Sequence, residues 1–347
     1  MTELRVGVIG VGAIGAWHAR ILAEGAKARL VALCDLDYEK VGALSESLGA
    51  KAYTEPTDLF AEGKLDGVII ATPEHAHLEH LQLAAEHGVA ALVEKPVAAD
   101  VSTIQSMIEI ARNAGIMVMA GHVERFEVGS AQLKAALDEG VCGSVVSVMA
   151  RRQFAPVEAP RFAGISSTLK VLGVHDFDLL RWVHPAPIID VYAVAGRGPL
   201  YEQFGLDDHV VTTVRFAGGA IGTVESAWNL PPAYTDFAKP SVWSGAGNNR
   251  LDVFGREGFI SNDMSMRSQQ LIAFDQIEGF RPAGLRHQTV IHGRVEGALR
   301  IEVDHFVDCL AADKTPIVGL EDGLRAVSLM VAAEEALATE KPVTPEL

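Results

Sequence analysis

The sequence predicts an α/β domain with a doubly wound parallel sheet, followed by an α+β domain whose open sheet is largely antiparallel. Up to about residue 122, short apolar runs alternate with stretches of helical periodicity, which is typical of a parallel sheet covered by helices. Beyond that point, strand patterns follow one another without helices between them, which favours antiparallel pairing. We therefore expect two domains, at residues 1–122 and 123–347.

The first domain is expected to alternate strands and helices. Apolar runs predict strands at residues 6–9, 30–34, 68–71, 90–93 and 116–119. Helical periodicity predicts helices at residues 16–23, 76–86 and 101–113, the last ending at Gly115 as its C-cap. Ligands of such sheets bind beyond the carboxyl ends of the strands.

The second domain is expected to be rich in strands. Helices are predicted at residues 131–139, 175–183, 298–311 and 320–339, and strands at residues 144–152, 188–195, 209–216, 220–228, 251–254 and 271–274. Gly218-Gly219 is typical of a hairpin turn. One face of an open sheet can pack on helices, and the other is a natural surface for self-association, so we expect a homodimer or homotetramer.

A glycine-rich turn stands between the first strand and the first helix. Gly10 permits a tight turn, Gly12 lets the backbone approach a pyrophosphate, and Gly15 lets the helix pack closely on the strand. Ala13 and Ile14 complete the turn and open the helix, whose N-terminal N–H groups attract phosphates. We expect a Rossmann domain that binds a dinucleotide.

An acid at the end of the second strand predicts the type of dinucleotide. Asp35 stands 25 residues after Gly10. Its carboxylate can accept hydrogen bonds from both ribose hydroxyls and would repel a 2′-phosphate, so we expect NAD rather than NADP.

Composition excludes several classes of partner. The net charge of −16 disfavours nucleic acid and anionic membrane surfaces. The three cysteines, Cys34, Cys142 and Cys309, show no metal-ligand spacing and favour a reducing compartment. With neither a signal-peptide pattern nor an apolar run of about 20 residues, we expect a cytoplasmic protein without a membrane span.

Polar residues follow four of the predicted strands. They are Asp35, Thr72-Pro73, Glu94-Lys95-Pro96 and Gly121-His122. Because the carboxyl ends of parallel strands share one edge of a sheet, we expect these groups to line one crevice.

These motifs together resemble the glucose–fructose oxidoreductase / inositol dehydrogenase / MocA-like oxidoreductases. The resemblance runs along nearly the whole chain and is carried by Gly10–Gly15, Ala71-Thr72-Pro73 with His77, Glu94-Lys95-Pro96, Gly121-His122 with Glu124-Arg125-Phe126, Gly173–Asp176, Glu302–Leu310 and Glu321–Arg325. It implies a nicotinamide-dependent dehydrogenase or reductase acting on a secondary alcohol of a sugar, polyol or sugar derivative.

The resemblance also implies which residues are catalytic. Lys95 matches the catalytic lysine and His175 the general acid/base. A histidine suits proton transfer because its pKa lies near neutrality, and an ammonium suits an oxygen that gains negative charge. Glu94 either orients Lys95 or holds the ribose of the cofactor.

One position departs from the family pattern. Many members carry an aspartate four residues before the histidine, where this chain has Val171. Three interpretations stay open: His175 acts with Lys95 alone, the neighbouring Lys170 takes part in an altered site, or catalysis is lost.

Other residues are weaker candidates. Thr72 and Pro73 are expected to line the cofactor, with His77 near the nicotinamide. Possible substrate contacts come from Arg125, Arg152, Lys170 and Trp228, and also from Arg151, Arg161, Asn229 and the loop 234–249. The histidines at positions 75, 77, 80 and 87 lack a completing cysteine or carboxylate, so we expect no metal site.

Two alternatives to a simple dehydrogenase remain. One is a lyase or hydrolase that oxidises its substrate transiently and keeps NAD tightly bound. The other is a non-catalytic regulator that senses NAD or a sugar and acts through a protein partner.

Overall fold

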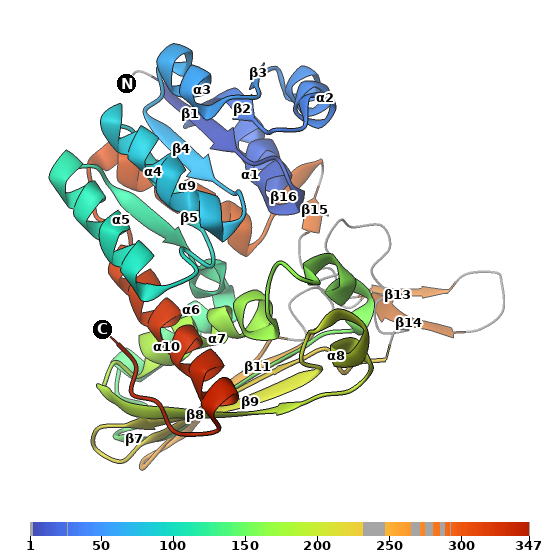
Figure 1. The fold of residues 1–347 in the computed structure, drawn as a ribbon, viewed down its shortest axis with the longest axis vertical. Helices are drawn as coiled ribbons and strands as arrows, with labels where there is room; N and C mark the ends of the chain where they lie inside the picture. Colours follow the sequence, from blue (N-terminus) through green and yellow to red (C-terminus); the bar gives the residue numbers. More distant parts are fainter. Residues whose placement is uncertain are drawn as a thin grey trace. The chain divides into compact units, whose positions relative to one another are not determined.

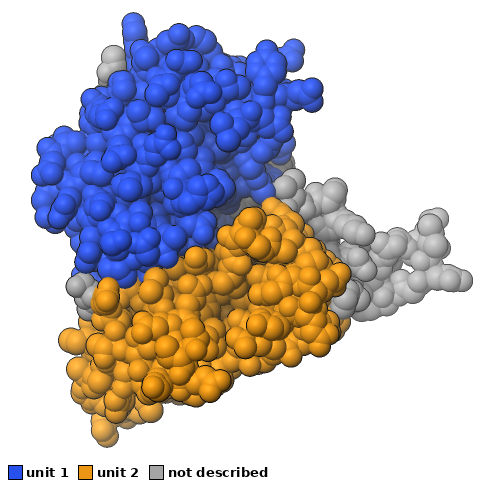
Figure 2. All heavy atoms as spheres, viewed as in Figure 1, with its two compact units in different colours: residues 1–126, 290–327 blue, residues 127–289, 328–347 orange. Residues whose placement is uncertain are grey.

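The structure is a computed structural model of the 347-residue chain, and it describes residues 3–25, 27–231, 247–264, 271–274, 280–284, 289–291 and 293–346. The chain divides into two compact units (Figure 2). The first consists of residues 1–126 and 290–327, and the second of residues 127–289 and 328–347.

A six-stranded parallel sheet forms the centre of the first unit (Figure 1). Its strands are β1 (Leu4–Ile9), β2 (Ala28–Cys34), β3 (Lys51–Tyr53), β4 (Gly67–Ile70), β5 (Ala90–Glu94) and β6 (Val118–Gly121). They lie in the order β3-β2-β1-β4-β5-β6, and every neighbouring pair is parallel. This order is that of a dinucleotide-binding fold and confirms the predicted doubly wound sheet. The direction of winding reverses between β1 and β4, so a ligand crevice is expected at the carboxyl ends of these two strands.

Helices connect these strands close to their predicted positions. They are α1 (Ala13–Glu24), α2 (Tyr38–Leu48), α3 (Pro56–Gly63), the short helix η1 (Glu74–Ala76), α4 (His77–Glu86) and α5 (Val101–Ala114). Gly115 caps α5 with a φ of +66° and donates its N–H to the carbonyls of Ala111 and Arg112. The sequence-based prediction did not include β3, α2 or α3. A three-residue strand such as β3 is too short to show periodicity.

The first unit also contains a segment from much later in the chain. We expected residues 123–347 to form one domain, whereas residues 290–327 are part of the first unit. The reason is that α9 (Ala298–Ala312) packs against α1 and against the short helix η2 (Val123–Phe126). Within α9, the side chain of Phe306 lies beside Gly67 of β4.

The second unit is built on another six-stranded sheet (Figure 1). Its strands are β7 (Val145–Gln153), β8 (Ile188–Gly196), β9 (His209–Phe216), β10 (Ile221–Ala227), β11 (Asn248–Gly255) and β12 (Phe259–Asp263), in the order β12-β11-β7-β10-β9-β8. Only β7 and β10 pair in parallel within this sheet. The predicted, largely antiparallel sheet is therefore confirmed. Gly218 and Gly219, with φ of +91° and +93°, form the predicted turn between β9 and β10.

Helices cover one face of this sheet. The helices and turns of the unit are α6 (Val128–Asp138), η3 (Pro156–Phe162), the π-helical turn η4 (Leu169–Gly173), α7 (Val174–Val183) and α8 (Pro199–Phe204), and α10 (Leu320–Thr339) runs through both units. Helix α7 packs on β7 and β10, where Val148 and Val224 are fully buried. The opposite face exposes apolar side chains, among them Met149, Val194 and Ile221.

Four further short strands are β13 (Leu271–Phe274), β14 (Phe280–Gly284), β15 (Thr289–Ile291) and β16 (Arg294–Glu296). The predicted strand at 271–274 is β13, which pairs with β14. Within the described ranges, every helix is too short or too polar to span a lipid bilayer.

Candidate active site

The glycine turn after β1 has the shape that a pyrophosphate requires. Gly10 has a φ of +85°, and a Cβ there would lie 2.6 Å from the carbonyl oxygen of Ala71 at the end of β4. A Cβ on Gly15 would lie 1.8 Å from the carbonyl oxygen of Gly10, so α1 packs directly on the turn. A Cβ on Gly12, by contrast, would meet no described atom within 4 Å. The turn is closed where it packs on the protein and open where a phosphate would approach.

The beginning of α1 is suited to an anion. Among the described residues, no side chain caps this helix at Gly12. Its first N–H groups, those of Ala13, Ile14 and Gly15, therefore lack the side-chain acceptor found at many helix starts. A helix N-terminus next to an open glycine turn fits the diphosphate of a dinucleotide.

Asp35 follows β2 and contacts the same turn. Its Oδ2 accepts the N–H of Val11 at 2.7 Å, and its Oδ1 accepts the N–H of Asp37 at 3.1 Å. The ammonium of Lys40 lies 3.5 Å from Oδ2. The carboxylate is thus fixed at the carboxyl end of β2, where the ribose of a dinucleotide is held in this type of fold.

His77 joins the strand ends after β4 and β5. Its Nε2 lies 2.8 Å from the carbonyl oxygen of Thr72, and its Nδ1 lies 3.0 Å from that of Val97. Burial lowers the pKa of His77, and the two carbonyls oppose this shift. Thr72 also contacts His80, with 3.3 Å between Oγ1 and Nδ1. The ring of His77 therefore ties the Thr72-Pro73 turn to the segment that follows Lys95.

Glu94 and Lys95 end β5. The Nε2 of His18, on α1, lies 2.8 Å from Oε1 of Glu94, and the backbone N–H of Lys95 donates to Oε2 at 3.0 Å. Burial alone would raise the pKa of Glu94, but the hydrogen bond and charge of His18, together with Lys95, hold it below its usual range. Of the two roles left open for Glu94, this geometry supports orientation of Lys95.

Glu302 on α9 lies beside this pair. One side-chain atom each of His18, Glu94 and Glu302 lies within 4.8 Å of the other two, and all three residues are buried. Sequence analysis quoted Glu302 only as the first residue of a resembling stretch. The signal that could have found it is a glutamate on the face of α9 that also carries the buried Leu299, Val303 and Phe306.

Arg125 is buried in η2 and contacts the start of α10. Its Nη2 lies 3.2 Å from Oδ1 of Asp322, and its Nη1 donates to the carbonyl of Ile317 at 3.4 Å. We had named Arg125 as a possible substrate contact from the sequence, and its pairing with Asp322 was not anticipated.

In the second unit, His175 is the second residue of α7. The π-helical turn η4 leads directly into this helix, and the His175 side chain is mostly buried. The next residue, Asp176, receives two hydrogen bonds from Arg152 of β7: Nε donates to Oδ2 at 2.8 Å and Nη2 to Oδ1 at 3.0 Å. This bidentate ion pair, with Asp176 0% and Arg152 3% exposed, fixes the start of α7 to the sheet.

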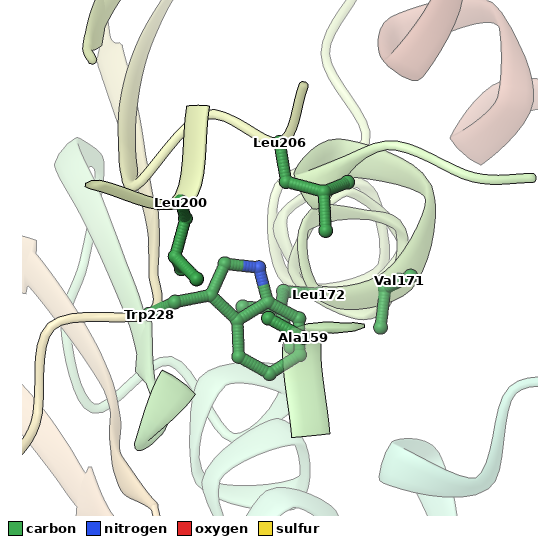
Figure 3. Packing of buried hydrophobic residues seen from close by; sticks show 6 residues of the cluster. All are labelled: Ala159, Val171, Leu172, Leu200, Leu206 and Trp228. Atoms are coloured by element: carbon green, nitrogen blue, oxygen red, sulfur yellow. The ribbon is translucent and has the colours of Figure 1, made fainter. Parts of the chain in front are cut away.

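Val171 lies in an apolar cluster with Trp228 (Figure 3). The cluster consists of Ala159, Val171, Leu172, Leu200, Leu206 and Trp228. Phe162 stacks on the indole at a centroid distance of 6.1 Å, and Nε1 of Trp228 donates to Oγ1 of Thr168 at 3.2 Å. Apolar packing thus occupies the position at which the family pattern has an acid.

The remaining substrate candidates are less constrained. Lys170 is half-buried, and its backbone N–H donates to Oγ of Ser167 at 3.1 Å. Most of the candidate loop 234–249, namely residues 234–246, lies outside the described residues. Cys34 is a core residue of the first unit, and its burial raises the pKa of the thiol to about 12.

Comparison with known proteins agrees with this geometry. Residues 4–122 match the family described as an oxidoreductase family with an NAD-binding Rossmann fold, and residues 130–261 match the GFO/IDH/MocA C-terminal domain. The chain is 27% identical to a myo-inositol 2-dehydrogenase of Thermotoga maritima, over 99% of each chain. It is also 27% identical to an NAD(+)-dependent scyllo-inositol 2-dehydrogenase of Bacillus subtilis, over 98% of this chain and 96% of the relative.

A solved structure shares the fold. The scyllo-inositol dehydrogenase of Lactobacillus casei, solved with NAD(H) and scyllo-inositol, superposes with a TM-score of 0.81 at 17% identity, over 99% of each chain. The resemblance stated from the motifs is confirmed, and with it the oxidoreductase activity and the NAD cofactor. This protein belongs to the GFO/IDH/MocA family of NAD-binding oxidoreductases.

Proposed function

We propose that this oxidoreductase transfers a hydride between NAD and a secondary alcohol of a polyol, sugar or sugar derivative. The observation that carries the proposal is the position of Lys95, which directly follows β5 at the carboxyl edge of the sheet that also carries the glycine turn. Relatives similar over almost the whole chain are named as inositol dehydrogenases, which supports a cyclic polyol as the first substrate to test.

The chemistry divides between two side chains. His175 accepts the proton of the substrate hydroxyl, for which an imidazole has a suitable pKa. The ammonium of Lys95 stabilises the negative charge that the substrate oxygen gains. NAD, when bound, supplies the nicotinamide that accepts the hydride. The Arg152–Asp176 pair and the Glu94 carboxylate hold the backbone next to these two residues.

The open sheet of the second unit supports self-association. Its outer face exposes Met149, Tyr192, Val194, Ile221 and Phe254, and burying such side chains against a second copy is favourable. We infer a homodimer or homotetramer. Light scattering at micromolar concentration should give a mass of two or four times 37.0 kDa, and a monomer would contradict this inference.

The three cysteines support a reducing location such as the cytoplasm, because all three are buried and free.

The experiment that tests the activity is a substrate screen. Cyclitols, aldoses, sugar acids and nucleotide sugars are incubated with the protein and NAD, and NADH absorbance is followed. We expect turnover with at least one cyclitol or sugar, and an increase in KM or a fall in kcat for His175→Gln. NAD that copurifies tightly and gives no NADH with any compound would overturn the proposal and favour transient oxidation or a regulatory role.

A further inference from the structure

The first unit contains a carboxyl group that the mechanism above does not use. Glu302 lies on α9 and is 0% exposed. Among the described residues, no side-chain or backbone group donates a hydrogen bond to either of its side-chain oxygens. A buried ionised carboxylate without a donor is very unfavourable, so the group is either neutral or balanced by a cation.

The neighbouring groups decide between a proton and a metal ion. His18, Glu94 and Glu302 bring one side-chain atom each within 4.8 Å of the others. Two atoms bound tetrahedrally to one zinc ion at about 2.1 Å would lie about 3.4 Å apart. The 2.8 Å between Nε2 of His18 and Oε1 of Glu94 is shorter than this and is typical of a hydrogen bond. His18 and Glu94 are therefore joined by a hydrogen bond and not through a metal ion, which leaves a proton as the group that neutralises Glu302.

We propose that Glu302 is a protonated acid at neutral pH, that its proton lies between the carboxyl groups of Glu302 and Glu94, and that Glu302 is thereby a positioning residue for Lys95. Glu94 then holds three groups: the ring of His18, the proton of Glu302 and the backbone N–H of Lys95. The protonation does not depend on the proposed function, whereas the effect on Lys95 rests on it.

The charges around Glu302 agree with this state. Burial raises its pKa well above the usual range, and the charges of Glu94 on β5 and Glu124 on η2 raise it further. His18 on α1 is the neighbouring side chain that can carry a positive charge. It forms its hydrogen bond with Glu94 and not with Glu302. On α9 itself, Arg300 pairs with Glu24 of α1. Arg125 of η2 pairs with Asp322.

The first test detects the proton directly. Infrared spectra of the whole protein near pH 8 are recorded for the C=O stretching band of protonated carboxyl groups, since ordinary glutamates are ionised there. We expect this band in the wild type, its loss in Glu302→Gln and its persistence in Glu109→Gln, which removes an exposed carboxyl from α5. A wild type without the band, or a band that survives in Glu302→Gln, would overturn the proposal.

The second test measures positioning. Glutamine can donate a hydrogen bond to Glu94 as the protonated acid does, whereas leucine cannot. Glu302→Leu should lower kcat by about tenfold to a hundredfold through displacement of Lys95, and Glu302→Gln should recover most of that loss. Equal kcat in the leucine variant and the wild type would exclude the positioning role. If the leucine variant does not fold, Glu302→Met, which also lacks a donor, takes its place in the kcat comparison, and the infrared result still decides the protonation.

Two further results distinguish a failure of the proposed function from a failure of the protonation proposal, and a proton from a metal ion. If Lys95 proves dispensable while the infrared band is present and sensitive to Glu302, the proposed function fails and the protonation stands. A stoichiometric divalent ion in the purified protein, lost together with thermal stability in Glu302→Gln, would show that a metal occupies the cluster and would contradict the shared proton.

Discussion

The two units fix their catalytic candidates by different means. In the first, Lys95 and the glycine turn follow parallel strands, so the topology of the sheet brings them to one edge. In the second, His175 lies near the start of α7. The Arg152–Asp176 ion pair holds this helix start, and the turn that precedes it contributes Leu172 to the Trp228 cluster. The first arrangement depends on backbone geometry and glycine, and the second on buried side chains. Substitutions should therefore act on cofactor binding in one unit and on stability in the other.

The largest effect on stability is expected from Arg152→Met. Removing the guanidinium leaves the Asp176 carboxylate without its bidentate partner in the protein interior, which should cost about 3–5 kcal/mol of unfolding free energy. Chemical denaturation measures the change. Arg215→Met removes an exposed pair with Asp190 on the same sheet and should cost less than about 1 kcal/mol. Equal losses in the two variants would contradict the structural role given to Arg152.

Two glycines of the first unit separate cofactor binding from folding. Gly12→Ala places a methyl group in open space at a φ of −62°, so the melting temperature should stay the same, while the Kd for NAD rises by about a hundredfold or more because the backbone can no longer approach the diphosphate. Gly15→Ala forces α1 away from Gly10 and should lower both affinity and stability, the latter by about 1–3 kcal/mol. Calorimetric titration and thermal melts test both variants. Unchanged NAD binding by Gly12→Ala would contradict the assignment of the glycine turn to diphosphate binding.

Val171→Asp tests the apolar cluster of the second unit. An ionised carboxylate among Leu172, Trp228 and their neighbours should cost about 1–3 kcal/mol. Val157→Asp, at an exposed position in η3, is the matched control and should change stability by less than about 0.5 kcal/mol. A Val171→Asp variant as stable as the wild type, with higher activity on simple polyols, would instead show that the site readily accepts the acid of the family pattern.

The difference in stability between the wild type and Glu302→Gln should depend on pH. Because the folded chain holds the carboxyl of Glu302 protonated, with a raised pKa, while the unfolded chain releases the proton above about pH 4.5, ionisation favours the unfolded state as pH rises. The wild type should therefore lose stability relative to Glu302→Gln between about pH 5 and pH 8. Below about pH 5, the stabilities of the two proteins should change in parallel with pH. Thermal melts across this range check the sign, and a constant difference would contradict it.

The smallest effect is expected at Asp35. Asp35→Ala removes acceptors for the ribose hydroxyls and leaves Lys40 without its nearby carboxylate. The Kd for NAD should rise about tenfold, and the preference for NAD over NADP should narrow. Titrations with both cofactors measure the two Kd values. An unchanged preference for NAD would show that Asp35 does not select the cofactor.

Sequence reasoning predicted most of the fold because hydrophobic periodicity is strong in these elements. The ends of α5, α9 and β9 agree with their predicted positions to within one or two residues. It did not predict that residues 290–327 return to the first unit, because the choice of sheet for an amphipathic helix depends on tertiary packing. The helix pattern of 298–311 is the same whichever sheet it covers.

The candidate site was predictable where a motif carries it. The glycine turn, Asp35 and Lys95 lie at strand ends, as their positions in the sequence indicate. The partners of buried charges were not predictable, since Arg152 with Asp176, Arg125 with Asp322 and Glu94 with His18 are pairs far apart in the chain. Such pairs depend on which faces meet in three dimensions, and no spacing rule encodes that.

The central claim is that Lys95 acts on the substrate beside bound NAD. Its most direct test compares Lys95→Met with the wild type in two assays: steady-state NADH formation with the best substrate of the screen, and calorimetric titration with NAD. We expect kcat to fall by about a thousandfold while the Kd for NAD changes by less than about threefold. A methionine variant with the wild-type kcat would contradict it.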